Sequence, residues 1–278
     1  MRPKRKIRVI HHMARSGGTI LTRCLGAMRD TVMLSEVHPR GTGPNVARVS
    51  SVDQKVHNPI WQAQTWFKLF TDAEYKELMA QYKNVIDAEM FPYVIELIAN
   101  AIRKEKFIVL RDWSHLDYTG IPYVKKPLYR PSIVDVLEDR FEVIRYASAR
   151  HPIYQWISLS RLKVIADRLK IDDFLYGYFK FADMAKEIGF IRYEDFTDDP
   201  DGKLQILCRG LDLPFDPDYR HYWMDYAFMT GDINKKIMSN KREIVSANTR
   251  KIPPKMLETF ERNDYYHASL ALLGYRQS

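Results

Sequence analysis

The residues best suited to chemistry lie in a short glycine loop near the start of the sequence, residues 15–19, which reads Arg-Ser-Gly-Gly-Thr. An apolar run at residues 7–10 precedes the loop, and a helical pattern follows it from Ile20. Backbone N–H groups at the start of a helix bind anions well when small residues let the anion approach closely. We therefore predict that the loop amides and the Arg15 side chain bind a phosphate-like group.

This loop differs from the one that binds nucleoside triphosphates. The nucleotide loop has a Lys and then a Ser or Thr after its second glycine, where they contact phosphates and Mg²⁺. Here Gly18 is followed by Thr19 and Ile20, and the basic residue comes first, as Arg15. This order suits an anion that is bound without a metal ion. Because no His or carboxylate pair beside the loop has the spacing of metal ligands, we expect no metal site.

A second anion site is predicted where Arg150 follows the fourth apolar run. Pro152 marks the first turn of a helix, and Ser158 lies inside that helix, eight positions after Arg150. With a rise of about 1.5 Å per residue, the hydroxyl is within reach of a ligand that the guanidinium holds. Together the two groups could bind a terminal phosphate. The alternative is that Arg150 pairs with a local carboxylate and Ser158 faces a neighbouring helix.

The elements that would position these residues alternate along the chain. Short runs rich in Val, Ile and Phe predict strands at 7–10, 32–34, 107–110, 141–146 and 190–193. Helical patterns lie at 20–28, 59–70, 72–82, 91–104, 132–138, 153–169, 171–187, 202–211 and 254–273. This alternation predicts an α/β fold with a parallel sheet and helices on both faces.

Ligands of such sheets bind beyond the carboxyl ends of the strands. The predicted strand ends carry the loop 15–19, Ser35-Glu36, Arg111-Asp112, Arg150-His151 and Glu194-Asp195. We therefore expect the functional side chains to meet at one edge of the sheet. Two segments rich in Gly, Pro and polar residues, 39–58 and 121–131, are expected to be loops or lids near that edge.

Composition narrows the possible partners. A chain of 278 residues that is 46% hydrophobic can form one domain, which we expect to span 1–278. The net charge of +8 and pI near 9.3 predict an anionic partner. Since the basic residues are scattered, a compact anionic ligand fits better than nucleic acid or a membrane surface. Two cysteines, no apolar stretch of about 18 residues and no signal-peptide pattern favour a cytoplasmic protein.

Three motifs together resemble the sulfotransferase family. They are the loop 15–19, the pair Arg150 and Ser158, and the segment 191–196 (Ile-Arg-Tyr-Glu-Asp-Phe) with Asp199-Pro200 after it. They stand in the family's order and span most of the chain. The resemblance implies a P-loop-like three-layer α/β/α sandwich with the phosphate loop after the first strand. It also implies the donor 3′-phosphoadenosine-5′-phosphosulfate (PAPS), which leaves the 3′,5′-bisphosphate (PAP) as product.

The resemblance also implies roles for individual residues. Arg15 and the amides of Ser16, Gly17, Gly18, Thr19 and Ile20 would bind the 5′-phosphosulfate, and Arg150 with Ser158 would bind the 3′-phosphate. Tyr193 would lie near the adenine. A segment at 228–250 resembles the family's cofactor-covering loop, in which Lys241 and Arg242 would close over the 3′-phosphate. From the residues alone, a solvated charged turn fits Lys241-Arg242 equally well.

The catalytic residues are only partly defined by the sequence. Arg15 would stabilise charge on the departing phosphate, and a general base must take a proton from the acceptor. Many cytosolic members have a His two positions after a strand-end Lys, but here Trp113 stands two positions after Arg111. Glu36 fits the placement of the base in the bacterial and protein-tyrosine branches. Glu36 and His115 are therefore the two candidate bases, with His38 as a third.

These residues predict a PAPS-dependent sulfotransferase that acts on a hydroxyl or amine of a small-molecule acceptor, for instance a secondary metabolite. Two other functions stay open. A P-loop small-molecule kinase could use Asp112 as a Mg²⁺-binding carboxylate. A non-enzymatic polyanion-binding module would account for the high pI.

Overall fold

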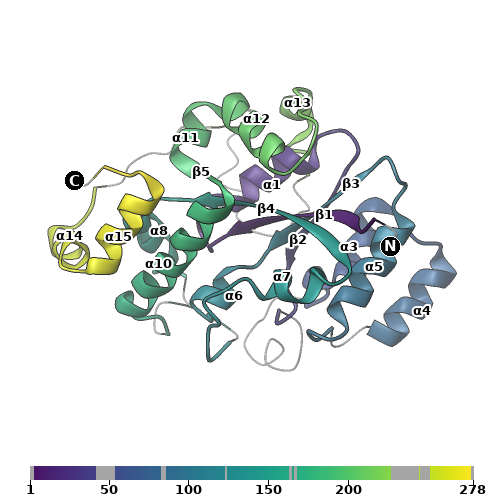
Figure 1. Cartoon of the computed structure of the whole chain (residues 1–278), viewed down its shortest axis with the longest axis horizontal. Helices are drawn as coiled ribbons and strands as arrows, with labels where there is room; N and C mark the ends of the chain where they lie inside the picture. Colours follow the sequence, from purple (N-terminus) through teal and green to yellow (C-terminus); the bar gives the residue numbers. More distant parts are fainter. Residues whose placement is uncertain are drawn as a thin grey trace.

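The structure is a computed structural model that describes residues 3–41, 54–82, 86–122, 124–162, 165, 168–226, 244 and 251–276. Its centre is a sheet of five described strands: β1 (Arg5–His12), β2 (Thr31–Val37), β3 (Phe107–Asp112), β4 (Phe141–Ala149) and β5 (Phe190–Arg192). The spatial order is β2-β3-β1-β4-β5. Every neighbouring pair is parallel. The predicted α/β class is confirmed (Figure 1).

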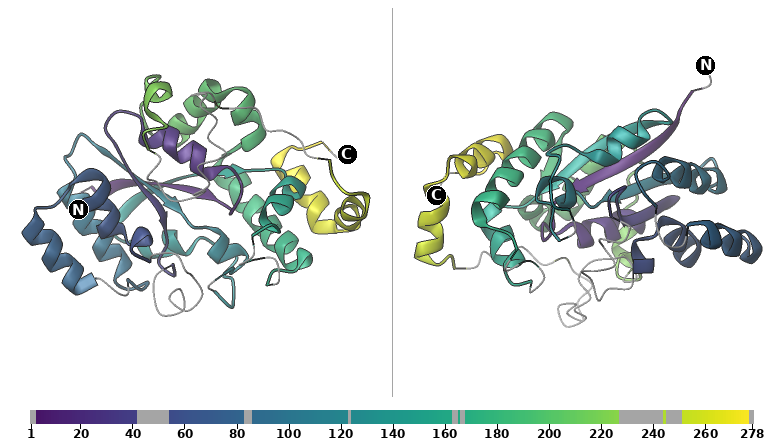
Figure 2. Two further views of the ribbon diagram at one scale, coloured as in Figure 1. Left: turned by 180° about the vertical axis from the view of Figure 1, so that it is seen from behind. Right: turned by 90° about the horizontal axis from the view of Figure 1, so that it is seen from below.

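The strands are apolar on both sides, and so both faces of the sheet need a cover of helices. Successive strand residues point to opposite faces. Val9 accordingly packs in one core cluster and Ile10 in another. In Figure 1, α12 and α13 lie above the sheet and α6 and α7 lie below it, and Figure 2 shows this layering from two other sides. The result is the predicted three-layer sandwich.

Three groups of helices surround the sheet. The helices on the Ile10 face are α1 (Gly18–Gly26), α11 (Tyr193–Asp198), α12 (Pro200–Gly210) and α13 (Tyr219–Tyr222). The Val9 face is covered by α3 (Pro59–Phe67), α4 (Asp72–Tyr82), α5 (Phe91–Ala101) and α7 (Ser132–Leu137), with the short 3-10 helix η1 (Gln54–His57) nearby. The third group, around the end of β4, comprises α6 (His115–Tyr118), α8 (Pro152–Leu159), α10 (Ile171–Ile188), α14 (Pro254–Glu261) and α15 (Asp264–Leu273).

The boundaries of several predicted elements were wrong. The helix predicted at 153–169 ends at Leu159, and the strand predicted to reach Tyr193 ends at Arg192. The helix predicted at 254–273 is two helices, because the Asn263 side chain accepts from the amides of Tyr265 and Tyr266 and so starts α15. At Asn263 the capping side chain therefore decided the helix boundary, although the apolar pattern continues through it.

The predicted loops fall partly outside the described residues. Segment 39–58 contains η1, and its residues 42–53 are not described. The described residues of 121–131 form neither helix nor strand, as expected. The covering loop at 228–250, with Lys241 and Arg242, lies outside the described residues except for Ile244. Among the described helices, none has the length and apolarity that a membrane span requires.

Candidate active site

The predicted phosphate loop connects β1 to α1 at the carboxyl edge of the sheet. Arg15 (φ 66°) and Gly17 (φ 85°) both have a left-handed backbone. Gly17 is the N-cap residue of α1, and it has no side chain that could cap the first-turn amides. Within the described part of the chain, no hydrogen-bond partner reaches the buried Oγ of Ser16. Helix-start amides that no side chain caps, beside a buried hydroxyl, are suited to hold an anion.

Both glycines of the loop are required by close neighbours. A Cβ on Gly17 would lie 2.0 Å from Cδ2 of Tyr193, and a Cβ on Gly18 would lie 2.7 Å from the His12 ring. Tyr193, for which the family resemblance implies a place near the adenine, therefore packs directly against the loop. The glycines are therefore needed for the backbone conformation of the loop and for the space that the Tyr193 and His12 rings occupy.

Substituting Gly17 with alanine is expected to destabilise the protein by about 1–3 kcal/mol, because the residue would combine a left-handed backbone with the clash against Tyr193. Urea unfolding measures this loss. Gly274→Ala is the matched control, since Gly274 also has a positive φ (66°), but a Cβ added there would meet nothing within 4 Å. A loss no larger in Gly17→Ala than in Gly274→Ala would contradict the clash.

The two predicted anion sites lie side by side. β1 and β4 are paired with His12 opposite Ser148, so the loop and Arg150 leave adjacent strand ends. Arg15 Nε donates to Ser158 Oγ at 3.0 Å, and Arg150 Nη1 donates to the Arg15 carbonyl at 3.1 Å. The structure thus brings together the basic side chains of both sites, and Arg15 contacts the serine that the family resemblance assigns to the other phosphate.

Arg150 also lies over an aromatic ring. Its guanidinium carbon is 5.2 Å from the centre of the Tyr193 ring. The ring that packs on Gly17 therefore contacts the second basic group as well. Tyr193 is therefore in contact with both predicted anion sites.

Arg111, at the end of β3, connects the loop to the candidate base. Its Nε donates to Nε2 of His12 at 2.5 Å, and its Nη1 donates to Ser35 Oγ at 3.1 Å. Its Nη2 donates to Thr19 Oγ1 at 3.3 Å and lies 3.3 Å from Glu36 Oε1. One buried guanidinium therefore fixes side chains from β1, β2 and α1.

His12 is a site residue that the sequence analysis did not single out. Burial and the neighbouring Arg111 lower its pKa to about 3, so the ring is neutral. A neutral ring can accept from Arg111 at Nε2 while Nδ1 donates to the Met13 carbonyl at 3.1 Å. The adjacent pair His11-His12 gives no sequence signal that separates this role from ordinary strand burial.

Glu36 lies on β2 where the register with β3 shifts between Ser35 and Val37. Its backbone is left-handed (φ 55°), and its side chain is 14% exposed. Oε2 lies 4.0 Å from Nδ1 of His57, whose ring stacks on Trp113 at 4.3 Å between centres. Glu36 is held between Arg111 and His57 and still reaches solvent.

His115, the other candidate base, is more deeply enclosed. Its ring contacts Trp113 edge-on at 5.3 Å. Together with Met13, Ala14 and Gln155 it lines a small, mostly apolar pocket. Burial lowers the pKa of His115 to about 4, so it is neutral at physiological pH.

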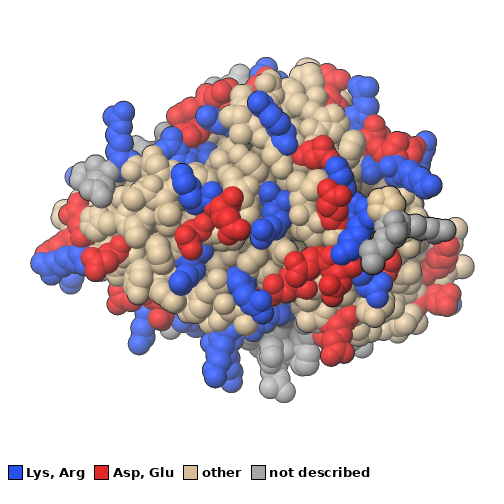
Figure 3. Space-filling model, in the orientation of Figure 1, with Lys and Arg blue, Asp and Glu red and all other residues tan. Residues whose placement is uncertain are grey.

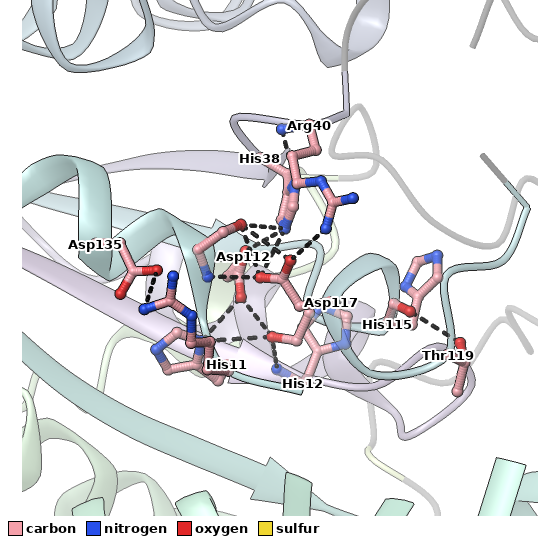
Figure 4. A network of polar contacts seen from close by, with 12 residues as sticks. His11, His12, His38, Arg40, Asp112, His115, Asp117, Thr119 and Asp135 are labelled. Atoms are coloured by element: carbon pink, nitrogen blue, oxygen red, sulfur yellow. Dashed lines mark hydrogen bonds and ion pairs between the residues drawn. The ribbon is translucent and has the colours of Figure 1, made fainter. Parts of the chain in front are cut away.

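His38 belongs to a buried polar network with Asp112 and Asp117, drawn in Figure 4. Its Nε2 lies 3.1 Å from Asp117 Oδ2, and its Nδ1 accepts the Arg40 N–H at 3.0 Å. Because both ring nitrogens are engaged, His38 is poorly placed to take a proton from an acceptor.

Asp112 is part of the same network. Its Oδ2 lies 2.8 Å from Nδ1 of His11 and accepts from Ser114 Oγ at 2.6 Å, in a fully buried position. A Mg²⁺-binding carboxylate needs oxygens that point toward bound phosphates. The Asp112 environment therefore gives no support to the kinase alternative.

The charges on the face shown in Figure 3 do not single out an extended polyanion site. On the face shown in Figure 3, described Lys and Arg side chains alternate with Asp and Glu over the same elements. A continuous basic stripe, as nucleic-acid binding requires, is not visible on the described surface of that face.

Comparisons with known proteins add the fold family. No family model and no curated protein matches the sequence. Among solved structures, a sulfotransferase domain from the curacin biosynthetic pathway matches with a TM-score of 0.59 and 16% identity, over 99% of this chain and 100% of that one. The chain has a sulfotransferase fold. The sulfotransferase domain of the Synechococcus PCC 7002 olefin synthase also matches, with a TM-score of 0.56 and 16% identity, over 100% and 98% of the two chains.

The sulfotransferase fold agrees with the family resemblance of the motifs, and the described residues place most of the predicted site. The residues that meet at the carboxyl edge are Arg15, Ser16, Gly17, Gly18, Thr19, Ile20, Glu36, Arg150, Ser158 and Tyr193. Sequence reasoning missed His12 and His57. His57 lies in η1, inside a segment with no periodic pattern. The available sequence signal was its position just before Asn58 and Pro59, which start the next helix.

The buried neutral histidines of this sulfotransferase fold make its stability depend on pH. His12 and His115 have folded-state pKa values near 3 and 4, against about 6.5 in an unfolded chain. Only the unfolded chain gains protons as the pH falls through 6.5 toward 4, so the free energy of unfolding must fall over that window. At pH 5.5 we expect a loss of about 1.4 kcal/mol per histidine relative to pH 8.

Urea unfolding at pH 8 and pH 5.5 measures that loss. His115→Gln should show a pH dependence smaller by about 1.4 kcal/mol than the unsubstituted protein, because the proton that His115 takes up on unfolding is removed from the balance. An unchanged pH dependence in this variant would show that His115 is not held neutral in the folded state.

Proposed function

We propose that this protein transfers a sulfuryl group from PAPS to a hydroxyl or amine of a small-molecule acceptor in the cytoplasm. The observation that carries the proposal is the juxtaposition of two anion-binding features at the ends of β1 and β4. One is the loop with Arg15, and the other is Arg150 with Ser158. A ligand phosphorylated at two positions of one ribose matches a pair of sites on adjacent strands.

The residues of the loop fit the phosphosulfate end of such a ligand. Gly17 and Gly18 leave no side chain between the helix-start amides and an approaching anion. The buried Oγ of Ser16 has no partner among the described residues, and a phosphate-like oxygen would supply one. Arg15 and Arg150 bring two positive charges, which suit the charge of PAPS and PAP.

Sulfuryl transfer resembles phosphoryl transfer in that the protein chiefly aligns the reactants and stabilises charge. PAPS would supply the sulfuryl group, and the rest of the molecule, PAP, would leave with the 5′-phosphate. Arg15 and the loop amides would stabilise the negative charge that develops on that phosphate. We propose Glu36 as the base that removes the acceptor proton, because it reaches solvent and is fixed by the same guanidinium that contacts Thr19.

The acceptor is proposed as a small molecule, and a secondary metabolite is one candidate. The two solved domains with the same fold come from the curacin biosynthetic pathway and from an olefin synthase. Incubation of the protein with PAPS and a panel of small hydroxyl and amine compounds, followed by mass spectrometry, would identify the acceptor from a product heavier by one sulfuryl group.

Calorimetry with PAP and with ATP plus Mg²⁺ tests the donor. We expect PAP to bind at least tenfold more tightly, because the Arg150 site would contact a 3′-phosphate that ATP lacks. Tight binding of ATP with Mg²⁺ and none of PAP would overturn the proposed function and favour a kinase. Salt-sensitive binding of heparin that survives Arg150→Ala, without PAP binding, would favour a polyanion-binding module.

A further inference from the structure

The peptide group between Arg150 and His151 is held from both sides. Tyr178, on α10, donates its hydroxyl to the Arg150 carbonyl oxygen. The His151 N–H donates to Oε1 of Glu194, on α11, at 3.0 Å. Because the carbonyl and the N–H belong to one planar peptide group, the two bonds fix the orientation of that plane. They therefore fix the direction in which the Arg150 side chain leaves the backbone.

Glu194 is in turn held by a residue near the end of the chain. Tyr275 donates its hydroxyl to Oε2 of Glu194 at 2.8 Å, so each carboxylate oxygen accepts a hydrogen bond from a described residue. Burial raises the pKa of the Tyr275 hydroxyl well above its usual range, and so the hydroxyl remains a donor at any physiological pH. A stable donor on one oxygen leaves the other oxygen oriented toward the His151 amide.

Tyr275 itself is fixed by its surroundings. Its N–H donates to the Leu270 carbonyl at 2.9 Å, which closes the end of α15. The Arg192 guanidinium lies 5.2 Å from the Tyr275 ring centre and donates to the Gly274 carbonyl at 2.6 Å. α15 packs along α10, the helix that carries Tyr178, as Figure 1 shows. The C-terminal helix is thereby tied to both residues that hold the Arg150 peptide group.

We propose that Tyr275 is a positioning residue for the second phosphate site: through Glu194 it orients the Arg150–His151 peptide group and so aims Arg150. This inference rests on the proposed function, in which Arg150 binds the 3′-phosphate. It gives the C-terminal helix α15 a part in nucleotide selection, through Tyr275, which follows the end of that helix. The expected consequence is a loss of affinity confined to ligands that carry the 3′-phosphate.

Tyr275→Phe tests the proposal, because it removes the hydroxyl and keeps the ring. We expect the Kd of PAP and the KM of PAPS to rise about 3- to 10-fold, as for one hydrogen bond to a charged group acting indirectly. The kcat at saturating PAPS and the Kd of adenosine 5′-phosphate should change less than about twofold. Tyr265→Phe is the matched control, since Tyr265 is an exposed tyrosine of α15, and it should leave all four values unchanged.

Equal losses for PAP and adenosine 5′-phosphate, or a lowered Tm with unchanged PAP affinity, would overturn the proposal. Amide hydrogen exchange at His151 in the ligand-free protein measures the positioning without any nucleotide. Exchange there should be at least fivefold faster in Tyr275→Phe than in Tyr265→Phe, and equal exchange would overturn the role of Tyr275. Failure of the unsubstituted protein to bind PAP would instead overturn the proposed function, and the exchange result would still decide the positioning.

Discussion

Glu36→Gln is expected to lower kcat by about 10²- to 10⁴-fold, the usual contribution of a positioned general base. The amide cannot take the acceptor proton, but it keeps the shape of the carboxylate beside Arg111 and His57. The Kd of PAP should therefore stay within about twofold, because the contact described between Glu36 and the phosphate loop runs through Arg111. Steady-state kinetics with PAPS and calorimetry with PAP separate the two effects.

The comparison that decides the base is His115→Gln. His115 is enclosed and lines a mostly apolar cavity, and we expect its replacement to reduce kcat less than tenfold. If His115→Gln abolishes turnover while Glu36→Gln remains near normal, His115 is the base and the role proposed for Glu36 is wrong. For His38→Gln we expect mainly a lower free energy of unfolding and only a small change in kcat. The reason is that the ring nitrogens of His38 contact Asp117 and the Arg40 amide.

Arg150→Ala has the second large expected effect, a rise of about 10- to 100-fold in the Kd of PAP. Charge-assisted hydrogen bonds to phosphate contribute about 1.5–3 kcal/mol each, and the substitution also removes the bond to the Arg15 carbonyl. For Arg150→Lys we expect a Kd of PAP between those of the unsubstituted protein and Arg150→Ala, because lysine keeps the charge and lacks the planar guanidinium. Calorimetry with PAP measures all three.

Arg262→Ala is the control for net charge, because Arg262 is exposed and pairs with Glu258 on α14. It should leave the Kd of PAP unchanged. An Arg150→Ala protein that binds PAP as tightly as Arg262→Ala would remove the second phosphate site from the proposal. The loop with Arg15 would then be the sole anion site argued from the described residues.

The sequence predicted the sheet well because its strands are buried on both faces. Residues 7–10, 32–34 and 107–110 are apolar almost without interruption, which is the pattern of a covered parallel strand. The ends of β1 were missed, because Arg5, Lys6, His11 and His12 are polar and are stabilised by distant partners. His11 contacts Asp112 and His12 contacts Arg111, which lie about a hundred positions further along the chain. Spacing along the sequence does not reveal such pairs.

The site was predictable where a motif carries backbone geometry. A phosphate loop needs glycines and the start of a helix, and both can be recognised in the sequence. Arg111 was noticed only as the counterpart of a family lysine, and its contacts with His12, Ser35, Thr19 and Glu36 depend on strand order. His57 comes from a short 3-10 helix without periodicity. Tyr275 lies far from every motif, and only packing of α15 on α10 brings it to Glu194.

The contacts of the two loop glycines restrict how this sequence can evolve. The space that a larger residue would need at position 18 is filled by His12, and His12 in turn accepts a hydrogen bond from Arg111. A lineage that replaced Gly18 would first need a smaller side chain at position 12, and that change would leave Arg111 without one of its acceptors. Positions 12, 18 and 111 are therefore expected to vary together or not at all among descendants of this protein.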